Sequence, residues 1–451
     1  TIDLDRMQVN KRYLLPGIFW ILVYLLLVSA PLIILLVGEV PQGREFWREL
    51  SVALGFAGLA MMSLQFVLTA RFKALKAPYG ADIVYHFHRQ VSLVAFVLII
   101  THPLLLFIFS PDNLKLLNLV TTPWRARAGV TSVVLLIVLI VSSLWRMRLR
   151  IEYTAWRIWH GVLSTVVVAL ASIHVILARH YLNTPWKQGL WIAYAVFWVS
   201  LLFYVRVLKP LYLLRRPYQV GRVQEERGNA WSVTVKPVGH KGLRFHPGQF
   251  AWVTVWNSPF AEAEHPFSFS SSASQPEQLT FTIKELGDFT RKIKTLQPGQ
   301  KVFVDGPFGH FSVDRHVQAE QFVFIAGGVG ITPIMSMMRT LADRGDQRPL
   351  ILLYANKDWG SVIFREEIEQ LKNVLNLKVV HVLGQPFPGW DGETGFIDGR
   401  ILTRYLPTEA RKNRVEIFIC GPQPMMDAIE KHLAGLGVPF GDYHSERFSL
   451  V

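Results

Sequence analysis

Four histidines in the first half of the sequence combine the residue type and the spacing of a paired metal site. His88 and His102 lie 14 residues apart, and His160 and His174 repeat that spacing. Fourteen steps of about 100° complete nearly four helical turns, so each pair shares one helix face, with its members about 21 Å apart. Two such helices running the same way would pair His88 with His160 and His102 with His174.

Two imidazoles that face each other across two helices suit one planar metal cofactor, namely haem with two axial histidines. Both axial positions of the iron are then filled, which favours electron transfer over the binding of a small ligand. Zinc would need four tetrahedral ligands, and the chain has a single cysteine. The alternative is that the four histidines are core residues that hydrogen-bond across helices. Against that alternative, ionisable side chains in membrane segments are costly and usually functional.

The elements that must position these histidines are long apolar runs. Each run is near the ~20 residues that cross a bilayer as a helix. They cover residues 14–37, 50–70, 83–109, 128–145, 156–178 and 190–208. Of the 451 residues only 18% are charged, and the mean hydropathy is +0.28, whereas soluble domains average about 25% charged residues. We therefore predict a six-helix transmembrane bundle that holds two haems.

The net charge of +14 would favour nucleic acid as the partner of a soluble protein. Here most basic residues of the membrane half gather in the N-terminal segment and after the second, fourth and sixth runs. Fewer lie in the opposite connections, among them Arg44, Arg125, Arg127 and Lys187. Because basic loops stay in the cytoplasm, we predict two cytoplasmic termini, a lipid bilayer as the surroundings, a bacterial inner or plasma membrane as the location, and no nucleic-acid partner.

The pattern of the chain changes after the sixth run. Residues 231–235 and 279–283 alternate apolar and polar side chains between Gly and Pro breaks, which predicts antiparallel strands and a small β-barrel. Beyond residue 320, apolar strands alternate with helical patterns, which predicts an α/β domain with a parallel sheet. The predicted domains are residues 1–213, 214–315 and 316–451.

Two strings in the predicted barrel suit a flavin. In His265-Pro266-Phe267-Ser268 the aromatic ring can stack on a flavin and the hydroxyl can hydrogen-bond its ring nitrogens. A second string runs from Lys284 to Thr290. Its Gly287 lets the backbone approach a pyrophosphate, and its Thr290 can cap a helix whose N-terminus holds that anion.

A glycine-rich string in the last domain suits a dinucleotide. Ala326-Gly-Gly-Val-Gly-Ile-Thr-Pro333 joins a predicted strand to a predicted helix, where glycines leave room for phosphates. Cys420 and Gly421 end a later strand, and ligands of such sheets bind at the carboxyl ends of the strands. A nucleophilic role for Cys420 is less favoured, because the sequence shows no histidine partner for it.

These motifs, in this order, resemble the ferric reductase and NADPH oxidase family of transmembrane electron-transfer enzymes. The membrane half resembles the ferric-reductase-like domain through its four paired histidines and through Tyr153-x-x-Trp156-x-x-x-His160. The second half resembles the ferredoxin-NADP reductase module through the strings above and through Asp305-Gly-Pro-Phe-Gly309. The resemblance covers most of the chain.

The resemblance implies an oxidoreductase in which cytoplasmic NADPH reduces FAD, and electrons pass through an inner and an outer b-type haem to an acceptor outside. NADH is the other possible donor. The implied FAD residues are His265, Pro266, Phe267, Ser268, Lys284, Gly287 and Thr290. The implied nicotinamide residues are Gly327, Gly328, Gly330, Thr332, Pro333, Lys357, Cys420 and Gly421. Lys357 would meet the 2′-phosphate of NADPH as a point charge, or is otherwise a solvated surface lysine.

The resemblance also implies catalytic positions for Cys420, beside the nicotinamide, and for Phe448, whose ring would shield the flavin. The acceptor stays open between oxygen, which would give superoxide, and a ferric or cupric chelate. NADPH oxidases often carry a further histidine one turn after the outer ligand, where this chain has Leu106. Outer arginines such as Arg44 and Arg125 could attract an anion. The alternative function is an electron-transfer subunit that feeds a membrane or periplasmic redox partner.

Overall fold

The computed structural model describes residues 11–70, 81–261, 263–407 and 414–447. The chain forms two compact units. The first unit comprises residues 15–76 and 83–210, and the second is built mainly from residues 211–451. Phe448, a predicted catalytic residue, lies outside the described residues.

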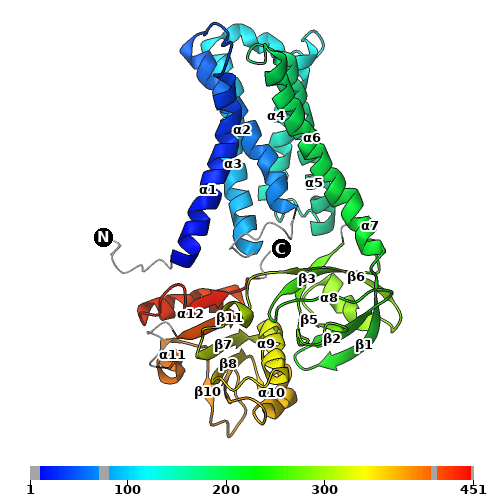
Figure 1. Cartoon of the computed structure of the whole chain (residues 1–451), viewed down its shortest axis with the longest axis vertical. Coiled ribbons are helices and arrows are strands. Elements are labelled where there is room, and N and C mark those ends of the chain that lie inside the picture. Colours follow the sequence, from blue (N-terminus) through cyan, green and yellow to red (C-terminus); the bar gives the residue numbers. More distant parts are fainter. Residues whose placement is uncertain (1–10, 71–80, 262, 408–413, 448–451) are drawn as a thin grey trace. The chain divides into compact units, whose positions relative to one another are not determined.

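The first unit consists of long helices (Figure 1). They are α1 (Lys11–Leu35), α2 (Phe46–Thr69), α3 (Ala81–Phe109), α4 (Trp124–Leu144), α5 (Tyr153–Ala178) and α6 (Pro185–Phe203), and a π-helical turn (Tyr204–Leu208) leads into α7 (Lys209–Leu214). Among the described residues six helical segments are long and apolar enough to span a membrane. The predicted six-helix bundle is confirmed.

Large apolar side chains lie on both the inside and the outside of this bundle. Leu59, Ala95 and Leu136 are buried between helices, whereas Leu22 and Val97 are exposed. An apolar surface of this kind is what a bilayer requires, because lipid solvates apolar side chains. Small residues let the helices approach closely.

Lys187, one of the basic residues counted in the opposite connections, lies inside the bundle at the start of α6. Its side chain is fully buried, and its Nζ donates hydrogen bonds to the carbonyl oxygens of Leu35 at 2.9 Å and Glu39 at 2.8 Å. The last carbonyls of a helix have no partner within the helix, so this lysine caps the C-terminal end of α1. Charge counting could not reveal this, because the carbonyls come from a segment some 150 residues earlier.

The second unit begins with an antiparallel sheet of six strands. They are β1 (Tyr218–Glu226), β2 (Ala230–Pro237), β3 (Phe250–Val255), β4 (His265–Ser268), β5 (Leu279–Lys284) and β6 (Lys301–Phe308), in the order β4-β3-β6-β1-β2-β5. Its inner face buries Val235, Phe269, Phe281 and Val302, while neighbouring residues point outward, as the period of two requires. The short helix α8 (Asp288–Lys292) follows β5.

A parallel sheet completes this unit, and its strands stand in the order β10-β9-β8-β7-β11-β12. The strands are β7 (Gln321–Gly327), β8 (Leu350–Asn356), β9 (Leu377–Leu383), β10 (Glu393–Thr394), β11 (Val415–Cys420) and β12 (Tyr443–Ser445). The helices are α9 (Ile331–Asp343), α10 (Arg365–Leu371), α11 (Gly399–Tyr405) and α12 (Gln423–Gly435). Both the curled antiparallel sheet and the parallel sheet confirm the predicted fold class.

Alternate residues of the parallel strands belong to two separate hydrophobic cores, one on each face of the sheet. Phe322 and Phe324 of β7 pack with α9 and α10 on one face, and Val323 and Ile325 pack with α11 and α12 on the other. Figure 1 shows these helices beside the sheet. The strand order reverses between β7 and β11, so the carboxyl ends of these two strands form the switch point where ligands bind in such sheets. The domain boundaries at residues 213 and 315 stay a prediction.

Candidate functional site

The four membrane histidines meet in the pairs that their spacing predicts. The ring centroids of His88 on α3 and His160 on α5 lie 6.4 Å apart, and those of His102 and His174 also lie 6.4 Å apart. In a five-membered ring with bonds of about 1.35 Å, each atom lies about 1.1 Å from the centroid. One metal between two imidazole nitrogens, with bonds of about 2.0–2.1 Å, therefore separates the centroids by about 6.3 Å. Both pairs fit this requirement.

The Nδ1 atom of each paired histidine is held by a protein group. His88 contacts the Oε1 of Gln65 at 2.8 Å, His102 the carbonyl oxygen of Ser51 at 2.9 Å, and His174 the carbonyl oxygen of Arg125 at 2.7 Å. Because these oxygens only accept, each Nδ1 must donate. A neutral ring that donates from Nδ1 presents an unprotonated Nε2, which is the form that ligates a metal.

The Nδ1 atom of the fourth histidine, His160, is held by the hydroxyl of Ser143. Ser143 donates to the carbonyl oxygen of Leu139 at 2.7 Å, so its oxygen can accept from Nδ1 of His160 at 3.1 Å. The indole N–H of Trp156 also reaches this hydroxyl, at 3.4 Å. Trp156 belongs to the string that supported the family resemblance, and here it orients the partner of His160.

Two glycines make room for the second pair of rings. A Cβ atom on Gly129 of α4 would lie 2.8 Å from Nδ1 of His174, and one on Gly55 of α2 would lie 3.2 Å from Cγ of His102. Any side chain at Gly129 would therefore displace the ring. These glycines and the Nδ1 partners were not among the predicted site residues. A signal was present, because Ser51 and Gln65 on α2 repeat the 14-residue spacing of the histidines.

Arg44 and Arg127 are engaged within the protein. Arg44 forms an ion pair with Glu49, at 3.4 Å, and donates to the hydroxyl of Tyr181 at 3.0 Å. Arg127 donates to the carbonyl oxygens of Thr122 and Val120. These contacts give both guanidinium groups a structural role beside any attraction for an anion.

The first flavin string forms β4, where it pairs antiparallel with β3. The Phe267 ring packs against the barrel core and lies parallel to Phe289, with centroids 6.1 Å apart. The ring of His265 also stacks on Phe289, with ring centroids 3.8 Å apart. Ser268 is buried and Pro266 is half-buried. The flavin contacts of these four residues stay a prediction.

The second flavin string ends β5 and begins α8. Lys284 is the last residue of β5, and Gly287 is the residue before the helix. The hydroxyl of Thr290 accepts from the backbone N–H groups of Leu286 at 2.8 Å and Gly287 at 2.9 Å. Thr290 therefore shapes the turn from the third helical position, whereas the sequence analysis expected it to cap the helix from outside.

The glycine-rich string lies at the switch point of the parallel sheet. A Cβ on Gly330 would lie 2.1 Å from the carbonyl oxygen of Cys420, and one on Gly421 would lie 3.1 Å from the backbone nitrogen of Gly327. Only glycines allow the ends of β7 and β11 to approach so closely. Gly328 has a φ of +53°, and a Cβ there would meet open space.

The first turn of α9, the helix that follows the glycine-rich string, is held in place by buried side chains and hydrogen bonds. Thr332 is buried and its hydroxyl donates to the carbonyl oxygen of Val329 at 2.8 Å. Pro333 is also buried in the first turn of α9, where a missing N–H costs nothing. The hydroxyl of Tyr354 on β8 donates to the carbonyl oxygen of Gly328 at 3.0 Å. The loop is thus pre-shaped to leave a space beside Gly328.

Cys420 and Lys357 lie in opposite environments. Cys420 is buried, and burial raises the pKa of its thiol far above the usual range, with Glu446 adding to the rise. A neutral, enclosed thiol is a poor nucleophile. Lys357 follows β8 at the same edge of the sheet and is exposed, which suits a phosphate contact and a solvated lysine equally.

Contacts from α9 hold the β4–β5 connection in place. Ser336 donates to the carbonyl oxygen of Ser271 at 2.8 Å, and Thr340 accepts from the backbone N–H of Ala273 at 2.9 Å. Arg339 donates to the carbonyl oxygen of Ser270 and binds Glu367 through two N–H groups at 2.6 and 2.7 Å. The helix that follows the glycine loop therefore also fixes the chain just beyond Ser268.

Three family models match successive parts of the chain. The oxidoreductase NAD-binding domain model matches residues 324–431, the FAD-binding domain model matches residues 219–312, and the ferric reductase like transmembrane component matches residues 54–171. Together with the fold, these matches define an NAD(P)H-dependent oxidoreductase with a membrane unit. The three matches, taken together, are those of a fusion of the ferric reductase and NADPH oxidase type.

Two curated relatives match between a third and a half of the chain. The stachydrine N-demethylase reductase subunit Stc4 of Rhizobium meliloti is 30% identical over 213 residues, which are 45% of this chain and 58% of that protein. NADH-cytochrome b5 reductase 1 of Cryptococcus neoformans is 34% identical over 163 residues, 34% of this chain and 55% of that protein. This chain thus spans little more than half the length of these curated relatives.

A solved structure is similar to about half of the chain. The cytochrome b5 reductase domain of Ulva prolifera nitrate reductase has a TM-score of 0.45 and 22% identity, and the match covers 52% of this chain and 98% of that domain.

Proposed function

We propose that this protein is a transmembrane oxidoreductase that uses cytoplasmic NADPH, FAD and two b-type haems to reduce an acceptor on the outer face of the membrane. The observation that carries the proposal is the pair of His–His sites, each with ring centroids 6.4 Å apart and with every Nδ1 held by a protein oxygen. Nicotinamide and flavin supply hydride and single-electron transfer when bound, and haem iron supplies one-electron steps.

The protein's own part in this function is to fix the ligands before the cofactor binds. Gln65 and the Ser51 carbonyl on α2 set the orientation of the α3 histidines, while Ser143 and the Arg125 carbonyl on α4 set that of the α5 histidines. Partners of this kind typically affect metal affinity by 10–100-fold. Stacked sites on the same two helices support electron transfer across the bilayer, because two histidines of one helix, such as His88 and His102, are about 21 Å apart along the axis. The two sites therefore lie at different depths.

In the second unit we assign the flavin to β4 and to the turn before α8, and the nicotinamide cofactor to the switch point. Gly328 leaves space for the dinucleotide phosphates, and the start of α9 offers backbone N–H groups to them. We assign Lys357 to the 2′-phosphate of NADPH, and we place Phe448 over the flavin by family resemblance. The three-domain division at residues 213 and 315 belongs to this proposal.

The proposed orientation of the protein in the membrane rests on the distribution of basic residues. Basic residues concentrate at the N-terminal segment and after the second, fourth and sixth helices, which supports cytoplasmic termini. His102 and His174 then form the outer site. These two histidines would hold the group that supplies single electrons to the acceptor, oxygen or a metal chelate, on that face.

The test compares the purified full-length protein with His102→Ala, and uses His86→Ala as the matched control. His86 lies on the same helix, two residues before His88, and is exposed. We expect two haems per chain in the wild type and in His86→Ala, and about one in His102→Ala, with reduction of bound FAD by NADPH unchanged. Equal haem content in all three proteins would contradict the assignment.

A further inference from the structure

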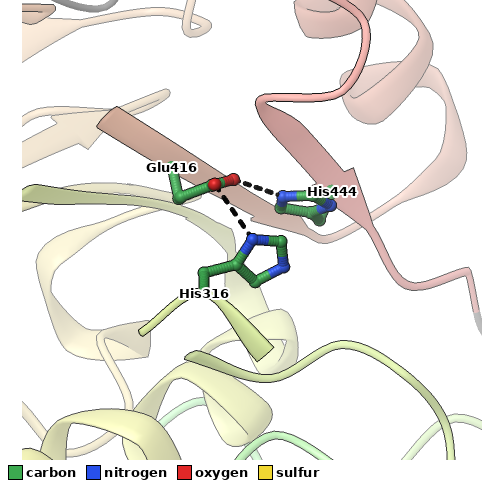
Figure 2. A group of neighbouring side chains, drawn as sticks. All are labelled: His316, Glu416 and His444. Carbon is green, nitrogen blue, oxygen red and sulfur yellow. Dashed lines mark hydrogen bonds and ion pairs between the residues drawn. The ribbon is translucent and has the colours of Figure 1, made fainter. Parts of the chain in front are cut away.

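Three side chains that commonly ligate metals meet in the nucleotide-binding sheet, away from the proposed redox cofactors (Figure 2). His316 follows the short turn at residues 313–315, Glu416 is the second residue of β11, and His444 is the middle residue of β12. One potential ligand atom from each lies within 4.8 Å of the other two. Residues from distant parts of the sequence thus converge on one point.

The carboxylate of Glu416 stands between the two imidazoles. Its Oε1 lies 3.0 Å from Nδ1 of His316, and its Oε2 lies 2.7 Å from Nε2 of His444. The exposed fractions of the three side chains are only 5%, 19% and 15% in the order His316, Glu416, His444. Phe418 contacts both rings, with centroids 5.7 and 5.1 Å away. The cluster is therefore largely shielded from water.

A second carboxylate lies beside Glu416. Because Ile417 of β11 pairs with Tyr443 of β12 in parallel register, Glu416 is level with Asp442, and the period of two puts Asp442 on the same face as His444. Asp442 is 8% exposed, and within the described part of the chain its Oδ2 has no hydrogen-bond partner. One buried and one partly buried carboxylate thus lie side by side, and a nearby positive charge would stabilise both in their ionised form.

We propose that His316, Glu416, His444 and Asp442 form a binding site for one divalent transition-metal ion, and that the ion is Zn²⁺. Two imidazole nitrogens and two carboxylate oxygens are ligands that zinc accepts in tetrahedral geometry. The ion's two positive charges neutralise both carboxylates. A tetrahedral site with bonds of about 2.0–2.1 Å has ligand atoms about 3.3 Å apart. His316, Glu416 and His444 each place one ligand atom within 4.8 Å of the other two, so these atoms lie within about 1.5 Å of the tetrahedral spacing. Asp442 is not in this group of three and would complete the site by a rotation of its side chain.

This site is distinct from the proposed nicotinamide site. Glu416 is near the amino end of β11 and Cys420 is at its carboxyl end, about 13 Å away at 3.3 Å per residue. The ion would tie β12 to β11 and to the segment at His316. β12 leads directly to Arg447, which binds Asp427 and Glu430 of α12. Zinc would thus fix the edge strand of the sheet.

The experiment measures zinc binding by the purified full-length protein, with any affinity tag removed. Samples are stripped with a chelator, dialysed against a series of free Zn²⁺ concentrations, and analysed for zinc by mass spectrometry, which separates zinc from iron. The variants are Glu416→Gln, which keeps the shape of the side chain, and His444→Gln. The matched control is His246→Gln, which removes another histidine that pairs with a carboxylate, Asp314, at 2.9 Å.

The expected result is one saturable Zn²⁺ per chain in the wild type and in His246→Gln, with affinity weakened about 100-fold or more in both cluster variants. Zn²⁺ should also raise the unfolding temperature of the wild type, because it binds only the folded state, and slow hydrogen exchange at residues 443–445. Flavin content and the metal-free unfolding temperature show that the variants fold. Wild type that binds no zinc, or variants that fold and bind it equally well, would overturn the proposal.

Discussion

Replacing Gly129 by alanine tests whether the His174 ring is positioned for a metal. The new Cβ would lie 2.8 Å from Nδ1 of His174, whereas ordinary contacts begin at 3.4 Å. The ring must therefore retreat by about 0.6 Å, the difference between these two distances. Metal–ligand distances are held to within about 0.2 Å in real sites. The substitution should thus release the outer haem while the inner site stays intact.

Two other glycines give a graded series. A Cβ on Gly55 would lie 3.2 Å from the His102 ring, so that ring needs to move by only about 0.2 Å, whereas a Cβ on Gly189 of α6 would meet nothing within 4 Å. We expect haem content to fall to about one per chain in Gly129→Ala, to fall slightly in Gly55→Ala, and to stay at two in Gly189→Ala. Pyridine haemochrome spectra and protein quantification provide the measurement.

The direction of the effect separates ligand displacement from helix propensity. Alanine stabilises a helix interior by about 1 kcal/mol relative to glycine, so propensity alone would strengthen α4 and retain both haems. Two haems with an unchanged bis-histidine spectrum in Gly129→Ala would refute the reasoning.

Three further predictions concern the second unit. Lys357→Ala should raise KM for NADPH much more than KM for NADH, in steady-state assays with an artificial acceptor, and equal changes would remove its phosphate role. Cys420 should resist a thiol-labelling reagent until the protein unfolds, because it is buried and its pKa is raised; rapid labelling of native protein would contradict this. Burial lowers the pKa of His381 from 6.5 to about 4, so the unfolded chain binds the proton more readily, and stability should fall by up to about 3 kcal/mol as pH falls from 6.5 to 4. Chemical unfolding at several pH values should show a shallower dependence in His381→Phe, and an identical dependence would exclude this contribution.

Local periodicity explains why much of the arrangement could be predicted. The 14-residue spacing of His88 and His102 fixes their common helix face, and alternation along β7 fixes which residues face each core. The position of the Gly330 loop could also be predicted, because a glycine string between a strand and a helix has few structural alternatives.

Contacts between distant segments could not be predicted in the same way. Nothing local marks Arg125 as the residue whose carbonyl holds His174, because every residue has a carbonyl. The cluster of His316, Glu416 and His444 forms only when β11 and β12 pair and the loop at residue 316 folds over them. The burial of Lys187 against the end of α1 could not be predicted for the same reason.

The central claim is tested most directly by following haem absorbance when NADPH is added to the purified protein with FAD under argon. We predict that the haem bands reduce, and that they reoxidise when air or ferric citrate is then admitted. A superoxide-dismutase-sensitive signal in air would identify oxygen as the acceptor, and reoxidation by ferric citrate alone would identify a metal chelate. Haem that stays oxidised under argon, while FAD is reduced, would contradict the account and favour a subunit that requires a redox partner.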